Sequence, residues 1–256
     1  MHLWHAIIEG IVEGITEFLP ISSTGHLMLT SEILNIANIE FVKSFEIIIQ
    51  LGAILAVVVL YPKRLLMDKP TIYRVAAAFL PTAILGLAFY KVIKHYLLGN
   101  LVVVLAALFL GGIAIILFEK FWKPTATKNI TDLTLKESAA IGLLQCVAFV
   151  PGVSRSAMTI FSGMWMGLSR KEAVEFSFFL AVPTMAAATG LDLLKNYQLI
   201  LLGGNFMLLG VGFVVSFLTA LGAIKLLLRY VSTNDFVLFG VYRIVLALLF
   251  AKVFFF

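Results

Sequence analysis

Three glutamates recur at four-residue intervals near the start of the chain, in a segment that is otherwise apolar. Glu9, Glu13 and Glu17 lie within "EGIVEGITEFLPISSTGH". Residues four apart share one helix face, where like charges repel, and an unpaired carboxylate in apolar surroundings is costly. Because Mg²⁺ and Ca²⁺ prefer carboxylate oxygens, we predict that Glu13 and Glu17 hold a divalent cation. Glu9, one turn farther from the tip, is expected only to line the approach.

The residues that follow the glutamates add hydroxyl groups and an imidazole. "SSTGH", from Ser22 to His26, supplies two serines, a threonine and a histidine within five residues. Such a segment also fits a turn and helix cap, and a histidine can be an ordinary core residue. We take Ser22, Ser23 and His26 as candidate site residues because Glu17 lies just upstream.

A second segment, "PGVSRSAMT", places Arg155 between two serines, with Thr159 one turn later. Arginine cannot be neutralised, so in apolar surroundings it requires a permanent anion. Its planar fork suits phosphate, and N–H groups at a turn that leads into a helix add to the attraction. The alternative is that Arg155 only pairs with a carboxylate, and both roles can hold before a substrate arrives. Acids with a metal, a nucleophile and an arginine at one point predict a phosphoryl-transfer site.

The composition places these residues in a membrane protein. The 256 residues are 61% hydrophobic and 13% charged, whereas soluble domains have about 45–50% apolar and about 25% charged residues. We therefore predict an all-α integral membrane protein, and we attribute the net charge of +5 to topology and expect no nucleic-acid partner. Six apolar segments approach the roughly 17–25 residues that a spanning helix needs: 45–61, 72–90, 101–118, 173–193, 206–228 and 236–256.

In a membrane protein the glutamate stripe has an alternative explanation. The N-terminal helix could lie on the membrane surface, with its glutamates in water and its isoleucines in lipid. The residues "FLPISSTGHLML" that follow continue an apolar segment instead of a polar linker. Ionisable residues inside a membrane are functional candidates by default, so we favour the buried site. The first Lys or Arg is Lys43, and we expect that this segment is not a cleavable signal peptide.

The two halves of the chain match each other in sequence. Pro20 matches Pro151 and Phe45 matches Phe176, in both cases with an offset of 131 residues. Two matches at one offset predict an internal duplication within a single membrane domain. The predicted parts of this domain, 1–256, are repeat 1 at 1–118, a linker at 119–134 and repeat 2 at 135–256.

Each half is predicted to contain one broken segment followed by three spans. The broken segments, 3–34 and 135–168, are too short on either side of their turns to cross a membrane. Non-helical backbone at that depth must be buried in protein or line a cavity, so we expect both turns to face one polar pocket, with Ser23 at the position of Ser154. Because three spans are an odd number, the second half enters from the opposite side. The expected fold is an inverted-topology repeat with six transmembrane helices plus two re-entrant helix hairpins.

The distribution of Lys and Arg predicts the orientation. The side with loops 62–71, 119–137, 169–172 and 229–235 carries twelve of these residues with its flanks, against five on the other side. The positive-inside rule makes the richer side cytoplasmic. The site is then expected to open to the extracytoplasmic side, where both termini lie. The five residues of the poorer side are Lys43, Lys91, Lys94, Lys195 and Lys252.

At this point the residues resemble a known family. "VEGITEFLPISSTGH" and "PGVSRSAMT" are similar to the two signature regions of the undecaprenyl-pyrophosphate phosphatases, also called bacitracin-resistance proteins. The similarity extends to "SFEIIIQLGAILAVVV" and "EFSFFLAVP" and covers essentially the whole chain. It implies hydrolysis of undecaprenyl pyrophosphate to undecaprenyl phosphate and inorganic phosphate, which recycles the lipid carrier for peptidoglycan and other envelope polysaccharides. It also implies a divalent cation and a homodimer in the bacterial cytoplasmic membrane.

The resemblance assigns roles to the site residues. The acidic motif of the family falls on Glu13 and Glu17, the expected ligands for Mg²⁺ or Ca²⁺. Its serine–histidine turn and its arginine motif fall on Ser23, His26, Ser154, Arg155 and Thr159.

The mechanism that follows leaves some choices open. Ser23 is the expected nucleophile, and Glu17 or His26 takes its proton, with His26 or an activated water as other nucleophiles. Arg155 stabilises charge on the terminal phosphoryl group, helped by the hydroxyl groups of Ser22, Ser154 and Thr159. The alternative function is a transporter or flippase of an anionic lipid or solute, because inverted repeats with broken helices also build transporters.

Three further polar residues lie in predicted spans. Glu46 and Gln50 lie one turn apart on the first span and are expected to support the site or to lie at the interface. Arg243, about two turns into the last span, is expected to pair with an acid or a lipid headgroup.

Overall fold

The computed structural model describes residues 1–92, 99–121, 128–202 and 206–255 of the chain. These residues form helices and contain no strand, which confirms the all-α class. Six helices are long and apolar enough to cross a membrane, as predicted. They are α3 (Glu40–Leu60), α5 (Lys69–Val92), α6 (Leu101–Phe121), α9 (Arg170–Leu202), α10 (Phe206–Val231) and α11 (Val237–Phe255).

The ends of the long helices follow from local chemistry. Tyr61 precedes a proline, which disfavours helical backbone at that position, and α3 ends there with Tyr61 at φ −126° and ψ 42°. The short helix α4 (Pro62–Leu66) then begins with proline, whose missing N–H has no role in a first turn. Asp68 precedes α5 and accepts hydrogen bonds from the backbone and the hydroxyl group of Thr71.

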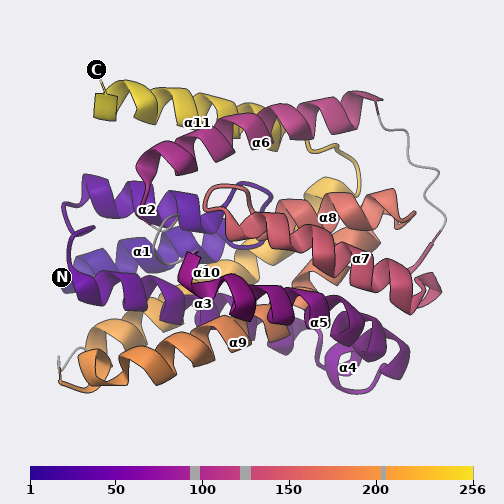
Figure 1. Cartoon of the computed structure of the whole chain (residues 1–256), viewed down its shortest axis with the longest axis horizontal. Helices are drawn as coiled ribbons and strands as arrows, with labels where there is room; N and C mark the ends of the chain where they lie inside the picture. The colour runs from indigo at the N-terminus through magenta and orange to yellow at the C-terminus, as the bar shows by residue number, and fades with distance from the viewer. Residues whose placement is uncertain (93–98, 122–127, 203–205, 256) are drawn as a thin grey trace.

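Two pairs of short helices accompany the spans. The first pair is α1 (Leu3–Thr16) and α2 (Ser23–Ile33), and the second is α7 (Leu135–Gln145) and α8 (Arg155–Trp165). The pairs enter from opposite ends of the molecule and their turns meet near its middle (Figure 1). The Ser156 hydroxyl donates to the carbonyl of Leu19 at 2.7 Å, which joins one turn to the other. This arrangement agrees with the expected helix hairpins, whose re-entrant position and inverted orientation in a membrane stay predictions.

The two turns share an unusual backbone conformation. Ser22 has φ 71° and Ser154 has φ 79°, in the left-handed region that non-glycine residues seldom adopt. Each serine caps the helix that follows, because its Oγ accepts a hydrogen bond from the N–H three residues on, at Gly25 in one turn and Ala157 in the other. The separation between the two caps is 132 residues.

This match corrects the predicted alignment. Ser22, not Ser23, corresponds to Ser154, and Ser23 corresponds to Arg155. The prediction was wrong by one residue because the second turn has one more residue between its proline and its cap serine than the first. The nucleophile candidate of one turn and the cation of the other thus occupy the same position, the first residue of their helices.

The helices that leave the turns also end alike. α2 is followed by Asn35 at φ 55°, and α8 by Gly167 at φ 96°. In both cases the N–H of the next residue bonds to the carbonyl five residues earlier, as in a Schellman motif. The separation is again 132 residues, which supports the predicted duplication.

The first helix pair is held by a close contact between α1 and α10. A Cβ atom on Gly14 would lie 1.9 Å from Thr219 Oγ1, and one on Gly10 would lie 2.8 Å from the carbonyl oxygen of Gly212. Only glycine therefore allows α1 to approach α10 this closely, while the glutamates on the neighbouring face of α1 are buried. The tight contact fixes the helix that carries the acids.

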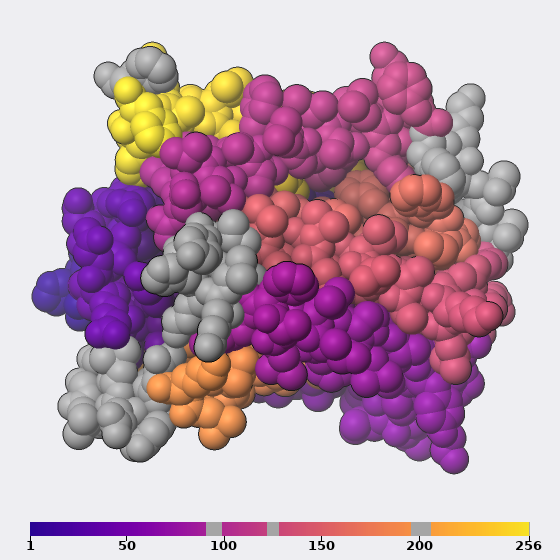
Figure 2. All heavy atoms as spheres, viewed as in Figure 1, coloured from indigo at the N-terminus to yellow at the C-terminus, as the bar shows by residue number. Residues whose placement is uncertain are grey.

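The second pair packs on two spanning helices, α7 on α5 and α8 on α9. Figure 2 shows the atoms of the α7 region between those of α6 and α5, on the face that is also seen in Figure 1. α7 packs closely on α5, where a Cβ atom on Gly142 would lie 1.8 Å from the carbonyl oxygen of Ala78. Lys94 and Lys123, two of the lysines counted for the orientation, lie outside the described residues.

Candidate active site

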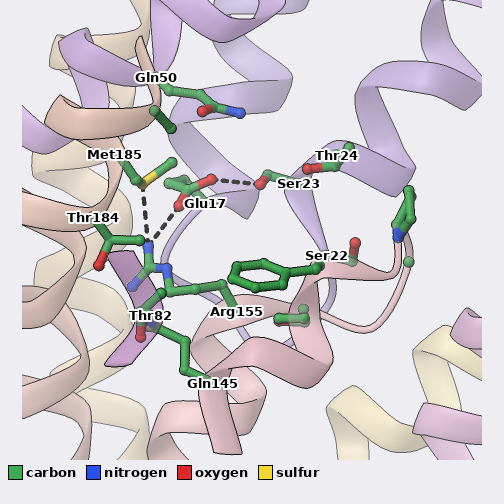
Figure 3. Close-up of a pocket in the computed structure, with 16 residues that line it drawn as sticks. Glu17, Ser22, Ser23, Thr24, Gln50, Thr82, Gln145, Arg155, Thr184 and Met185 are labelled. Carbon is green, nitrogen blue, oxygen red and sulfur yellow. Dashed lines mark hydrogen bonds and ion pairs between the residues drawn. The ribbon is translucent and has the colours of Figure 1, made fainter. Parts of the chain in front are cut away.

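The carboxylate of Glu17 joins the two turns. Glu17 follows the last residue of α1, and its side chain is 3% exposed. One oxygen, Oε2, accepts a short hydrogen bond from the Ser23 hydroxyl, and the other, Oε1, lies 2.5 Å from Nη2 of Arg155 (Figure 3). The structure therefore brings together the acid, the hydroxyl and the guanidinium that the sequence carries on separate segments.

These three groups face a cavity of about 230 Å³. Ligand pockets usually measure about 300–1,000 Å³, so this one suits a polar headgroup rather than a whole lipid. Five of the predicted site residues line it, together with polar residues from α2, α3, α5, α7 and α9. The five are Glu17, Ser22, Ser23, Ser154 and Arg155, and the other polar residues are Thr24, Gln50, Thr82, Gln145 and Thr184.

Arg155 is oriented by several hydrogen bonds, but not all of its N–H groups have a partner among the described residues. It is the first residue of α8, and its side chain is 14% exposed. Nη1 donates to the carbonyl of Ser177 at 2.9 Å, and Nη2 lies 3.5 Å from the sulfur of Met185. Nε has no hydrogen-bond partner in the described part of the chain. The guanidinium is thus oriented by the protein while one N–H group stays available.

Two helix N-termini converge on the same space. Ser22 and Ser154 both line the cavity and cap α2 and α8. The first N–H groups of a helix have no partner within it, and the helix dipole favours negative charge at this end. Backbone amides therefore add positive potential beside Arg155, as in other anion-binding sites at helix N-termini.

Glu13 is the group most in need of a partner. It is fully buried, and neither carboxylate oxygen has a hydrogen-bond partner among the described residues. It is close enough to Glu17, Arg155 and Glu46 to interact with their charges. Two neighbouring buried carboxylates, of which Glu13 has both oxygens unpaired, fit a hard divalent cation. In the described ranges no group of three or more His, Cys, Asp or Glu side chains is arranged to hold a metal ion by itself, so an ion at Glu13 and Glu17 would need further ligands from outside the protein.

Glu9 does not reach the cavity. Its Oε1 accepts a hydrogen bond from Ser31 at 2.9 Å, and the same hydroxyl lies 2.7 Å from Glu46. Glu9 and Glu46 thus belong to a separate buried cluster on α1, α2 and α3. Of the two residues predicted on the first span, only Gln50 lines the cavity.

His26 is placed differently from its prediction. Its Nδ1 is 2.7 Å from the carbonyl of Ser22, and its Nε2 is 2.8 Å from the hydroxyl of Tyr242. The two rings stack with an angle of 4° between their planes. Both ring nitrogens are therefore engaged, and the structure does not bring His26 to the cavity. The sequence could not reveal this, because the ring is oriented by a residue of the last helix.

Thr159 likewise supports the site from behind. Its hydroxyl lies 2.6 Å from that of Ser177 and 3.0 Å from the carbonyl of Arg155. Ser177 is also the residue whose carbonyl receives Nη1 of Arg155. Thr159 does not line the cavity, and it acts on the guanidinium through Ser177 instead of contacting a phosphate as predicted.

Arg243 corrects another prediction. Its side chain is fully buried, and it pairs with carbonyl groups instead of an acid or a lipid headgroup. Five backbone carbonyls receive its N–H groups at 2.8 to 3.3 Å, so all the donors of the fork are used. They belong to Pro20 of the first turn, Gly152 and Val153 of the second, and Ala107 and Leu108 of α6.

Arg243 therefore holds the backbone of both turns at once. A charge in the middle of a spanning segment marked the residue in the sequence, but the carbonyl partners lie on segments that only the fold brings together. Gly111 of α6 makes room for it, since a Cβ atom there would lie 2.1 Å from Nη2 of Arg243.

Comparison with known proteins identifies the family of the chain. The family described as bacitracin resistance protein BacA matches residues 6–249. The chain belongs to this family. The BacA match includes both turns, all five residues at the cavity and Arg243, and together with the six apolar helices it makes the chain a multi-pass membrane protein.

Three relatives match the chain over nearly its whole length. It is 49% identical to the undecaprenyl-diphosphatase of Aquifex aeolicus, covering 99% of each chain. It is 48% identical to that of Wolinella succinogenes, covering 98% of this chain and 97% of the relative. The undecaprenyl-diphosphatase of Bdellovibrio bacteriovorus is 49% identical, with 97% and 94% covered.

Proposed function

We propose that this protein hydrolyses undecaprenyl pyrophosphate to undecaprenyl phosphate and inorganic phosphate. The observation that carries the proposal is the Glu17 carboxylate, which bonds Ser23 with one oxygen and Arg155 with the other beside the cavity. Acid, nucleophile and cation are what phosphoryl transfer requires at one point. The name of the relatives gives the substrate. The product is the lipid carrier for peptidoglycan and other envelope polysaccharides.

Binding begins with an exchange of partners at Arg155. The polyprenyl tail stays in the bilayer, and the pyrophosphate enters the cavity between the two turns. Its oxygens receive the free Nε–H of Arg155 and the N-terminal amides of α2 and α8. As Nη2 turns from Glu17 to the phosphate, the Glu17 carboxylate loses its counter-charge and becomes a better base.

The chemical step uses the hydrogen bond that is already formed. Ser23 Oγ attacks the terminal phosphorus atom, and its proton passes to Oε2 of Glu17. The bond from that phosphorus to the bridging oxygen breaks, and undecaprenyl phosphate leaves with the bonding electrons. A water molecule then attacks the phosphoserine. Glu17 returns its proton to the departing Ser23 Oγ, and inorganic phosphate leaves with both hydrogens of the water. His26 takes no part in these transfers, since its ring nitrogens bond elsewhere.

A divalent cation, Mg²⁺ or Ca²⁺, is part of the proposal. Glu13 and Glu17 would hold it, and it would supply positive charge next to the phosphate oxygens. The unpaired oxygens of Glu13 support this assignment. A chelator is expected to abolish phosphate release and added Mg²⁺ or Ca²⁺ to restore it.

The orientation and assembly also belong to the proposal. The site opens to the extracytoplasmic side of the bacterial cytoplasmic membrane, because the Lys and Arg count places the other side in the cytoplasm. The protein works as a homodimer, as the family resemblance implies.

Glu17→Gln tests the function against a matched control. In detergent, wild-type protein should release inorganic phosphate from undecaprenyl pyrophosphate, and Glu17→Gln should lower kcat by about 100-fold or more because the base is lost. Glu9→Gln makes the same change on the same helix face, outside the cavity, and keeps an acceptor for Ser31; it should stay within about 3-fold of wild type.

Two outcomes would contradict the proposal. Wild-type turnover by Glu17→Gln would exclude Glu17 as the base. Binding of the lipid with no phosphate released by wild-type protein would favour the transporter instead.

A further inference from the structure

Gln145 has an amide whose orientation is fixed by its neighbours. It is the last residue of α7, it is 1% exposed and it lines the cavity. Its Nε2 lies 2.9 Å from Oγ1 of Thr82, and the same Oγ1 lies 2.8 Å from the carbonyl of Gly142. A hydroxyl group has one proton, and a carbonyl can only accept it. Thr82 therefore accepts from Gln145, which makes the atom that faces Thr82 the NH₂ group.

The other end of this amide has no partner. Oε1 of Gln145 is buried and receives no hydrogen bond from the described part of the protein. Leaving a buried acceptor unpaired is costly, so a donor must come from a molecule in the adjoining cavity. The donor cannot be a fully ionised phosphate, which carries acceptor atoms only.

Arg155 lines the same cavity and has an unpaired donor, whereas Gln145 has an unpaired acceptor. The Nε–H of Arg155 is a buried donor without a partner in the described part of the chain. An ionised phosphate oxygen satisfies this donor, and the hydroxyl group of a protonated phosphate satisfies Gln145. One ligand that carries both kinds of oxygen, a phosphate with a proton, therefore completes both unpaired groups.

We propose that Gln145 and Arg155 together select a phosphate group that carries a proton: Arg155 donates to an ionised oxygen, and Oε1 of Gln145 accepts from the P–OH group. This inference rests on the proposed function and specifies the form of phosphate that the site binds. The released product, inorganic phosphate, has such a form near neutral pH. Gln145 is a specificity-determining residue in this scheme.

The surroundings of Gln145 allow a pH test. Glu17 and Arg155 are the charged groups that line the cavity, and Glu13 is close enough to interact with both charges. The lining residues of α5 and α9, Thr82, Thr184, Met185 and Ala188, are uncharged. All of these groups are retained when only Gln145 is replaced, so a difference in pH profile between wild type and the variant reports on Gln145 and the bound ion.

Sulfate provides the comparison ion, because it is tetrahedral like phosphate but carries no proton near neutral pH. We expect phosphate to inhibit hydrolysis of a short-chain, soluble polyprenyl pyrophosphate at a concentration about 10-fold lower than sulfate, the discrimination typical of one buried hydrogen bond. Gln145→Leu should bring the two inhibition constants to within about 2-fold of each other. Gln50→Leu, the same change at the other glutamine of the cavity, should keep the preference for phosphate.

The pH dependence gives a second readout. From pH 6 to pH 8 the inhibition constant of phosphate should rise more steeply for wild-type protein than for Gln145→Leu, because only wild type depends on the phosphate proton. If Gln145→Leu does not fold, Thr82→Val removes the acceptor that fixes the amide and should lower the preference in the same direction.

Binding and catalysis can be judged separately. A thermal shift of the detergent-solubilised protein by phosphate and by sulfate measures the preference even without turnover, so absence of hydrolysis would reject the proposed function alone. Equal affinities of wild type for the two ions, or an unchanged preference in Gln145→Leu, would show that Oε1 bonds only water and would overturn the inference.

Discussion

Glu17 is the residue that hydrogen-bonds to donors from both halves of the chain. Its carboxylate has two oxygens and two different donors, a neutral hydroxyl from the first turn and a guanidinium from the second. Arg155 compensates the cost of burying the acid, and the same contact restrains the acid as a base until a phosphate competes for the arginine. The resting ion pair and the catalytic roles are therefore compatible.

Arg155→Lys is expected to lower kcat/KM for undecaprenyl pyrophosphate by about 100-fold. Lysine keeps the charge but cannot hold Glu17, Ser177 and a phosphate oxygen with one planar fork. Phosphate release under steady-state conditions is the measurement. Arg64→Lys, an exposed arginine that pairs with acids at 3.6 and 3.9 Å, is the control and should be neutral. An equally active Arg155→Lys would mean that only the charge matters.

The residue types and spacing predicted part of this site. Glu17, Ser23 and Arg155 were found because an acid, a hydroxyl group and an arginine in apolar segments need partners. His26 and Thr159 were misplaced because the direction of a side chain depends on contacts such as Tyr242 and Ser177, which local sequence does not contain. Gln145 was missed, although a glutamine six residues before a Pro-Gly turn is a polar residue in an apolar segment.

At the scale of elements, Arg243 connects helix α6 to the two turns, which have no regular hydrogen bonds of their own at this point. The carbonyls of the two turns lie outside helices, and a guanidinium from α11 replaces the partners that a helix would give them. The positions of Ser23 and Arg155, one residue beyond each cap, then follow from the held backbone.

Arg243→Leu removes this connection and leaves five carbonyls without their donor. We expect about 3–5 kcal/mol lower stability, seen as a lower Tm in detergent, and a lower kcat at unchanged protein concentration. Arg243→Lys should recover part of both, since a lysine reaches fewer carbonyls. Lys252→Leu, an exposed position on the same helix, is the control. An unaltered Tm and kcat in Arg243→Leu would contradict the role of the residue.

Replacing a glycine by alanine is expected to change the stability in opposite directions at two positions, Gly14 in the contact of α1 with α10 and Gly210 outside it. Gly14→Ala should destabilise the protein by about 1–3 kcal/mol, because its Cβ atom would overlap Thr219 and overpack the interface. Gly210→Ala has no atom within 4 Å of its Cβ and should be neutral or stabilise by up to about 1 kcal/mol through helix propensity. Thermal unfolding of both variants checks the pair, and a neutral Gly14→Ala would show that the helices can separate without cost.

At the scale of the whole molecule, the sequence predicted the number of spans and their approximate limits because hydrophobic length is a strong signal. The meeting of the two turns also followed, from the argument that broken backbone in a membrane must be buried. The register between the halves was wrong by one residue at the caps, because an added residue in a turn leaves the proline match intact. Both termini lie at one end of the molecule, as a total of six spans in the described residues requires (Figure 1).

Cysteine labelling tests which end faces the cytoplasm. In a variant without Cys146, Leu3→Cys and Lys136→Cys place single thiols at exposed positions of opposite ends. A membrane-impermeant maleimide applied to intact cells should label Leu3→Cys and not Lys136→Cys, and inside-out vesicles should give the reverse. Labelling of both from outside, or the reversed pattern, would contradict the extracytoplasmic site.

The junction of the two turns has a consequence for how the molecule works. Alternating access requires one half of a protein to rock against the other about a central site. Here such rocking would have to break, in one movement, the ion pair of Glu17 with Arg155, the bond from Ser156 to Leu19 and the hold of Arg243 on both turns. The lipid therefore moves farther than the helices do. Its headgroup enters the cavity from the bilayer and leaves through the same leaflet.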